Sequence, residues 1–373
     1  MENMGIKMFK NIYKGKKVLI TGHTGFKGTW LTTWLVSLGA EVIGVSKGIP
    51  TKPSMYEAVS LDKRVKSHFI DICDLDAIKK IIINEKPDFI FHLAAQAIVS
   101  ESYLDPVGTI ASNVIGTTNI LEALRFLDCS CTVVLITSDK AYDNVEQVWG
   151  YKEDDKMGGK DIYSGSKGAA ELIIKSYINS YFSNNNCKIK IAIGRAGNVI
   201  GGGDWAKDRI VVDCMRAWSV KKSVEIRSPL ATRPWQHVLE PLSGYLSLGE
   251  QLNKNKDLHG EAFNFGPRAE QNKTVIDLLE ALSGYWDFNS PADAFTVTDN
   301  IPFHEAGLLK LNCDKALSYL KWQATLDYSQ TVKFTSEWYY CFYNSSDSII
   351  NKTQDQILNY HDIAFSKGLS WTI

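Results

Sequence analysis

Five side chains in the first half of the sequence have the types and spacing for proton transfer: Ser138, Asp139, Lys140, Tyr163 and Lys167. Tyr163 and Lys167 stand four residues apart, which places them on one face of a helix. A neighbouring ammonium lowers the pKa of a phenol from about 10, and the phenolate can then take a proton from a hydroxyl group. Ser138 ends an apolar run upstream and can hydrogen-bond the same oxygen.

Asp139 and Lys140 follow Ser138 directly and add two groups that can transfer protons. One interpretation is an exposed acid–base pair on the surface. The alternative is that they serve a second reaction stage in addition to hydride transfer. Hydride transfer alone would need no acid or base beyond Ser138, Tyr163 and Lys167. Their position at the carboxyl end of a predicted strand favours the second interpretation.

A glycine-rich turn, TGHTGFKG, contains Gly22, Gly25 and Gly28 and lies between a predicted strand and a predicted helix. In that context glycines permit a tight turn, a close approach to a pyrophosphate and close helix packing. The helix start offers amides to phosphates. An ordinary glycine-rich turn is the alternative, but the spacing favours a dinucleotide site that also includes Thr24, Phe26 and Lys27.

The end of the second predicted strand reads Val45-Ser46-Lys47-Gly48, without the acidic residue that often holds the ribose of NAD. Lys47 is either an exposed loop lysine or a contact for a 2′-phosphate, so NAD is favoured with NADP as the alternative. Other expected cofactor contacts lie near the ends of later strands. They are Asp71, Ile72, Leu93, Ala94, Ala95 and Gln96, and we expect Tyr163 and Lys167 to contact the cofactor as well.

The elements that must position these residues alternate between apolar strands and helices. Continuous Val/Ile/Leu runs separated by helices predict a Rossmann-type, doubly wound parallel sheet in an α/β fold. The predicted strands are 17–20, 41–45, 88–93, 132–137 and 188–194, and the predicted helices are 28–38, 113–127 and 163–181. We expect a cofactor domain over 1–200, a smaller substrate-binding lobe mainly over 201–345 with one or two segments returning to the first domain, and a tail over 346–373. The polar stretch after Tyr343, NSSDSIINKTQDQ, is expected to be a linker to this tail.

Composition narrows the class of protein. The chain has 373 residues, of which 45% are hydrophobic and 22% charged, and its formal net charge is -1. Without a basic excess, neither nucleic acid nor a membrane surface is an expected partner. The seven cysteines are scattered with no CxxC pair, so we expect reduced thiols in a cytoplasmic protein and no metal site.

Further motifs carry a resemblance to one family. The sequence resembles the CDP-glucose 4,6-dehydratases, which belong to the extended short-chain dehydrogenase/reductases and make 3,6-dideoxyhexose precursors for bacterial surface polysaccharide such as O-antigen. The matching motifs are HTGFKG, PTKPSMYE, HLAAQ, TSDKAYDN, WGYKEDD, MGGKDIYSGSKG, RAGNVIGGGDWAKDR, ATRPWQHVLEPLSGY, NFGP and HEA. Related dehydratases of other nucleotide sugars have Glu after the catalytic Asp, whereas the CDP-glucose enzymes have Lys, as Lys140 is here.

The resemblance implies a mechanism. Tyr163 deprotonates the 4-hydroxyl of the sugar while NAD accepts hydride, and the new ketone acidifies the C5 hydrogen. Asp139 protonates the departing 6-hydroxyl, and the cofactor returns hydride to C6. Lys140 either removes the C5 proton or positions Asp139.

Substrate contacts are expected in the second lobe. Asn198, Arg209 and Arg233 are candidates for the diphosphate, since arginine presents a planar fork of donors, and His237 is expected beside the site. Relatives pair through two long helices, so the resemblance also implies a homodimer or homotetramer.

Three rival functions remain open at this point: dehydration of another nucleotide sugar, a dehydrogenase or epimerase with the same Ser–Tyr–Lys set, and a redox-sensing binding protein. Asp139 and Lys140 argue against the dehydrogenase and the epimerase. A binding protein would usually lack one of the three catalytic groups.

Overall fold

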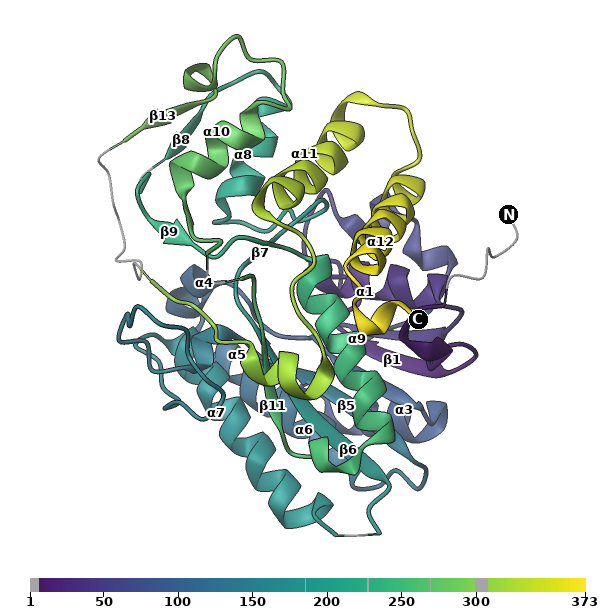
Figure 1. The fold of residues 1–373 in the computed structure, drawn as a ribbon. Helices are drawn as coiled ribbons and strands as arrows, with labels where there is room; N and C mark the ends of the chain where they lie inside the picture. The colour runs from purple at the N-terminus through teal and green to yellow at the C-terminus, as the bar shows by residue number, and fades with distance from the viewer. Residues whose placement is uncertain (1–6, 185, 227, 269, 299–307) are drawn as a thin grey trace.

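The computed structural model describes residues 7–184, 186–226, 228–268, 270–298 and 308–373. Among these residues, seven parallel strands form one central sheet in the order β11-β6-β5-β4-β1-β2-β3, which confirms the predicted fold class (Figure 1). The strands are β1 (Lys17–Thr21), β2 (Glu41–Ser46), β3 (Lys66–Phe69), β4 (Phe89–His92), β5 (Cys131–Ile136), β6 (Ile189–Ala196) and β11 (Ala262–Phe265).

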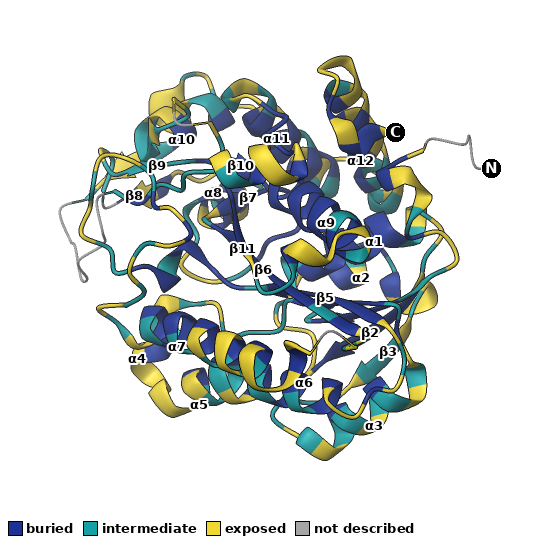
Figure 2. Cartoon of the chain, turned by 60° about the horizontal axis from the view of Figure 1, so that its bottom comes forward, coloured by how far each residue is buried: buried dark blue, intermediate teal, exposed yellow. Residues whose placement is uncertain are grey.

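Both faces of the sheet are buried, which explains the continuous apolar runs. Along β1, Val18 and Ile20 belong to one hydrophobic core while Leu19 belongs to the other, because successive side chains in a strand point to opposite faces. The central strands are accordingly buried in Figure 2. One face carries α3 (Leu75–Glu85), α6 (Gly116–Leu124) and α7 (Ile162–Tyr177), and the other carries α1 (Phe26–Ser37) and α9 (Leu239–Lys254).

Two long helices differ in detail from their predicted ranges. The predicted helix 113–127 is α6 preceded by a wide π-helical turn at Ala111–Ile115. The predicted helix 163–181 is α7 followed by a second π-helical turn at Ile178–Phe182. Asp161 fixes the start of α7, because its Oδ1 accepts a hydrogen bond of 2.9 Å from the amide of Ser164.

The region after residue 200 has a mixed arrangement. Part of it forms the smaller lobe at the top of Figure 1, with α8 (Ile210–Trp218), β8 (Val224–Ile226), α10 (Val275–Ser283) and β13 (Phe295–Val297). Two segments, α9 and β11, belong to the central sheet and its helical layer. Short two-stranded pairs connect the rest, namely β7 (Val199–Ile200) with β10 (Gln236–His237), and β9 (Thr232–Arg233) with β12 (Lys273–Thr274).

The predicted polar linker after Tyr343 is wrong. After α11 (Tyr328–Asn344), the helix α12 (Ile349–Ser366) begins inside the proposed linker and packs on α1 and α11. Its apolar residues, among them the buried Ile357, Tyr360 and Ala364, recur three and four residues apart on one face, so polar neighbours hide them in the linear sequence. The chain end also docks, since the amide of Lys10 donates to the carbonyl of Ile373 at 2.8 Å.

No helix within the described ranges is both long enough and apolar enough to cross a membrane.

Candidate active site

The glycine-rich loop between β1 and α1 excludes side chains at two positions. Gly22 has a φ of +77°, and a Cβ there would meet the amide nitrogen of Ala94 at 2.8 Å. A Cβ on Gly28 would overlap the carbonyl oxygen of Gly22. Gly25 donates its amide to the same carbonyl at 3.1 Å, which closes the turn. The bare loop and the start of α1 therefore fit a dinucleotide diphosphate.

The other predicted residues of this loop have distinct roles. Thr24 donates its hydroxyl to the carbonyl of Gly48 at 2.7 Å and ties the loop to the end of β2. Phe26 and Lys27 begin α1. The pKa of Lys27 is lowered to about 8, chiefly by burial, with the charges of Arg209 and Lys167 acting in the same direction and that of Asp139 opposing it. Lys27 therefore lies within electrostatic reach of Asp139 and Lys167.

Lys47, at the end of β2, forms an ion pair of 3.0 Å with Asp71. Lys47 is therefore exposed, as expected of a loop lysine. Its ammonium is already paired with a carboxylate, so it is less available to a 2′-phosphate. Ile72 follows, and its carbonyl accepts a hydrogen bond of 3.0 Å from the side-chain amide of Asn119 on α6. Asp71 and Ile72 follow β3, which is separated by β2 from β1, the strand that leads into the glycine-rich loop.

The segment Leu93–Gln96 leaves β4 beside the glycine-rich loop. The amide of Ala94 donates to Thr21 Oγ1 at 3.1 Å, and Leu93 pairs with the backbone of the same residue. The side chain of Asn113 holds Gln96, because Asn113 Oδ1 accepts a hydrogen bond of 2.8 Å from the backbone amide of Gln96. This segment and the loop therefore line one edge of the sheet, as predicted.

The residues predicted to transfer protons lie after the carboxyl end of β5 and in the first turns of α7. Ser138 Oγ donates to Asp139 Oδ1 at 2.9 Å and accepts the amide of Lys140 at 3.2 Å. Burial raises the pKa of Tyr163 to about 12, and a hydrogen bond with Ser138 opposes that rise. Lys167 Nζ lies 6.0 Å from the centre of the Tyr163 ring.

Burial changes the proton affinity of two further groups. It lowers the pKa of Lys167 to about 8, against the charge of Glu171, which raises it. It raises the pKa of Asp139, against the opposing charge of Lys140 and the hydrogen bond from Ser138. A carboxyl group whose pKa is raised holds its proton more readily, which suits a general acid.

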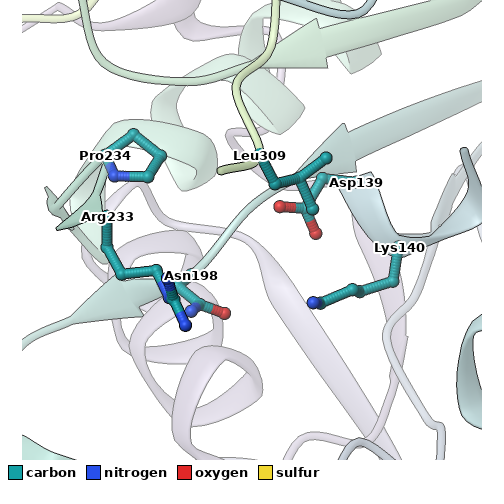
Figure 3. A pocket seen from close by; sticks show the side chains of 6 residues that line it. All are labelled: Asp139, Lys140, Asn198, Arg233, Pro234 and Leu309. Atoms are coloured by element: carbon teal, nitrogen blue, oxygen red, sulfur yellow. The ribbon is translucent and has the colours of Figure 1, made fainter. Parts of the chain in front are cut away.

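A pocket opens beside the turn that carries Ser138, Asp139 and Lys140, where side chains from both lobes meet (Figure 3). Lys140 and Arg233 reach into the same space from opposite sides, with Asn198 beside the guanidinium and the Asp139 carboxylate facing the gap. Two cations on one pocket suit an anionic ligand. The lining residues are Asp139, Lys140, Asn198, Arg233, Pro234 and Leu309.

Two predicted substrate contacts lie elsewhere. Arg209 is about one-third exposed and pairs with Asp204 at 3.4 Å, outside the pocket lining. His237 is fully buried, with its ring edge-on to Trp30 and Phe334 at centroid distances of 5.9 and 5.5 Å. This position does not support the prediction that His237 contacts the substrate. The imidazole packs inside an aromatic cluster and has no exposed surface that a ligand could touch.

Sequence reasoning missed several residues around the site. Pro234 and Leu309 line the pocket and were not among the predicted site residues. The predicted HEA motif at 304–306 is a different case, because it lies outside the described residues. Glu171 and Arg195 form a buried ion pair behind the catalytic turn. Glu171 follows Lys167 by one helical turn, and that spacing is the signal that could have identified it.

Comparison with known proteins decides the family. A family model described as GDP-mannose 4,6-dehydratase matches residues 19–335. The CDP-glucose 4,6-dehydratase of Salmonella typhimurium is 43% identical over 344 residues, covering 91% of this chain and 95% of the relative. The chain belongs to the GDP-mannose 4,6-dehydratase family.

Other members of this group of proteins are more distant. The CDP-paratose 2-epimerase of Salmonella typhi is 25% identical, with 86% of this chain and 98% of the epimerase covered. The solved structure of a dTDP-glucose 4,6-dehydratase from Streptomyces venezuelae has a TM-score of 0.73 at 18% identity, covering 87% of this chain and 96% of that chain. The structural likeness supports the fold of this dehydratase-family member.

Proposed function

We propose that this dehydratase-family chain converts CDP-glucose to CDP-4-keto-6-deoxyglucose with a bound NAD that is recycled within the reaction. The carrying observation is that Asp139 and Lys140 line one pocket with Arg233, directly after Ser138. The 43% identical relative supports CDP-glucose as the substrate.

The residues of the glycine-rich loop fit a dinucleotide, because Gly22 and Gly28 leave no room for a Cβ and Lys27 adds positive charge beside them. When bound, NAD would accept hydride from C4, return hydride to C6 and contribute a positive charge near Tyr163. The ion pair between Lys47 and Asp71 leaves less positive charge for a 2′-phosphate, which favours NAD over NADP.

The chain's own groups handle the protons. Tyr163, supported by the charge of Lys167, takes the proton of the 4-hydroxyl, and Ser138 holds the same oxygen. Once C4 is a ketone, the C5 hydrogen is acidic, and Lys140, which lines the pocket, removes that proton as a neutral amine. The resulting ammonium returns the proton to C5 as hydride adds to C6. Asp139, whose pKa burial raises, protonates the 6-hydroxyl as it leaves as water.

Asn198 and Arg233 are suited to the nucleotide diphosphate, since both line the pocket opposite Lys140. A guanidinium can donate two parallel hydrogen bonds to phosphate oxygens. Arg209 would reinforce the positive field without lining the pocket.

A homodimer is part of the proposal, and an association of two dimers remains the alternative. The outer sides of α6, α7 and the turns that flank them expose large apolar side chains. These are Ile115, Phe126, Ile162, Leu172 and Tyr181. Burying two such helices per copy in a four-helix bundle would remove this apolar surface from water.

The test uses purified protein incubated with CDP-glucose and no added reductant. The expected result is a 4-keto sugar, detected by its absorbance in alkali, without net consumption of NADH. GDP-mannose and dTDP-glucose serve as parallel substrates, and faster turnover of either would replace CDP-glucose in the proposal. Stoichiometric change in NADH would indicate a dehydrogenase instead, and no reaction with any substrate would support a binding protein.

A further inference from the structure

A buried ion pair joins α7 to β6 behind the catalytic turn. Arg195 donates from Nε to Glu171 Oε1 at 2.8 Å and from Nη2 to Oε2 at 2.5 Å, and the two side chains are 0% and 1% exposed. Neither residue lines the pocket. A ligand therefore cannot reach this pair, and any effect on the reaction must pass through its neighbours.

Those neighbours stand on both sides of the catalytic turn. Thr137, immediately before Ser138, donates its hydroxyl to Glu171 Oε1 at 2.6 Å. Tyr142, two residues after Lys140, accepts a hydrogen bond of 2.6 Å from Arg195 Nη1. The segment that carries Ser138, Asp139 and Lys140 is thus attached at each end to the same ion pair.

The far side of the network is anchored in the sheet. Tyr142 donates to Asn264 Oδ1 on β11 at 2.8 Å, and its ring stacks on Tyr151 with centroids 5.1 Å apart. Arg195 Nη1 also donates to the carbonyl of Glu153 at 2.9 Å. The strands β5, β6 and β11 that surround this network are neighbours in the sheet and buried in Figure 2.

We propose that Glu171 and Arg195, acting through Thr137 and Tyr142, are positioning residues that hold the Ser138–Lys140 turn in register with Tyr163 and Lys167 on α7. The proposal rests on the proposed dehydratase function for its effect on turnover. A buried ion pair adds little net stability, because desolvation of two charges offsets their attraction. It does fix geometry, and a displacement of about 1 Å at a catalytic group can cost about 100-fold in rate.

The turn itself is held by few bonds of its own, which makes outside support important. Its amides at 140, 141 and 142 donate to Ser138 Oγ, the Ser138 carbonyl and the Asp139 carbonyl at 3.2, 3.1 and 3.2 Å. These long bonds close a single 3-10 turn. Loss of either attachment should therefore loosen the turn before it unfolds the domain.

Two variants test the proposal while leaving the ion pair intact. Thr137→Val removes the hydroxyl that binds Glu171, and Tyr142→Phe removes the oxygen that binds Arg195 but retains the ring. The matched controls are Thr335→Val on α11 and Tyr360→Phe on α12. They remove buried hydroxyls that donate to the Thr331 carbonyl on α11 and to Glu240 on α9.

The first measurement needs no substrate. Hydrogen exchange of the amides at 140–142, followed by mass spectrometry, should accelerate at least tenfold in Thr137→Val and Tyr142→Phe and remain unchanged in both controls. The second measurement is turnover of CDP-glucose. The kcat of the two test variants should fall at least tenfold, with KM within twofold of the parent. The control variants should keep kcat within twofold of the parent even where their urea-unfolding midpoint falls as much as that of the test variants.

Unchanged exchange in both test variants would overturn the proposal, and so would a kcat that follows unfolding midpoint equally in test and control variants. If the parent protein does not act on CDP-glucose, the proposed function fails, and the exchange measurement still decides whether the ion pair holds the turn.

Discussion

At the scale of single residues, burial shifts the pKa values of the groups that the proposed reaction uses. It raises the pKa of Tyr163 to about 12 and lowers that of Lys167 to about 8. Both changes oppose the charged forms that a phenolate–ammonium pair uses. The phenol must therefore be activated by charge brought with the cofactor and by the hydrogen bond with Ser138.

Tyr163→Phe should reduce kcat at least about 100-fold, because the ring remains but the proton acceptor is lost. The initial rate of 4-keto sugar formation measures the loss, and the bound nicotinamide content of the purified variant serves as the control for folding. Residual turnover above about a tenth of the parent would contradict a general-base role.

Asp139→Asn should slow elimination far more than oxidation. The amide can hydrogen-bond the 6-hydroxyl but has no proton to give as water departs, so the absorbance of reduced nicotinamide should build up in a single turnover. Equal loss of both steps, with no build-up, would remove the general-acid role.

Lys140→Met separates two roles that the sequence left open. If Lys140 removes the C5 proton, the variant should lose exchange of the C5 hydrogen with deuterated water, measured by mass spectrometry of the sugar. Full exchange in Lys140→Met would assign the base to another residue and leave Lys140 a positioning role beside Asp139.

At the scale of elements, the sequence predicts the features that depend on contacts between residues close together in the chain. The β1–loop–α1 unit was predictable because its glycines are required by backbone contacts within a few residues, apart from Ala94. β11 was not predicted as a strand of the sheet, because its place beside β6 depends on a long crossover that leaves the sheet through α8 and β8 and returns through α9. Helix α12 was missed because its apolar face is diluted by polar residues.

The same distinction between local and long-range contacts applies to the residues of the candidate site. Ser138, Tyr163 and Lys167 follow from spacing on adjacent elements. Glu171 stands one helical turn after Lys167, but its contact with Arg195 joins a helix to a distant strand, so no spacing in the sequence predicts the pairing. His237 was misplaced because a short aromatic–basic motif does not reveal whether its ring points to a ligand or into the aromatic cluster with Trp30.

The attachment of α12 supplies a pH-dependent test. Glu240 on α9 is buried and accepts hydrogen bonds from Tyr360 and from the amides of Thr325 and Leu326. Burial raises its pKa to about 7, against those donors. Because the folded-state pKa lies above the unfolded value, the stabilisation is fully present below about pH 4.5 and is lost as pH rises through 7.

Glu240→Gln should therefore remove this part of the pH dependence. The free energy of urea unfolding of the parent, minus that of the variant, should decrease between pH 5 and pH 8, by up to about 3 kcal/mol. A difference that stays constant or increases over this range would contradict the raised pKa of Glu240.

At the scale of the whole molecule, the exposed apolar side of α6 and α7 defines the expected interface. Leu172 on α7 is 58% exposed, and Leu230 in the other lobe is 78% exposed. Leu172→Glu should convert the dimer to a monomer at micromolar concentration in light scattering, whereas Leu230→Glu should not. A monomeric parent would contradict the interface before any variant is made.

The central claim is that hydride leaves C4 and returns to C6 of the same sugar, while the chain supplies only proton transfers. The most direct test gives the protein CDP-glucose labelled with deuterium at C4, in ordinary water and without added reductant, and locates the label by mass spectrometry and NMR. The account predicts a 4-keto product that retains the deuterium at C6. A 4-keto product that lacks the label, or one that forms only as external NADH accumulates, would contradict it.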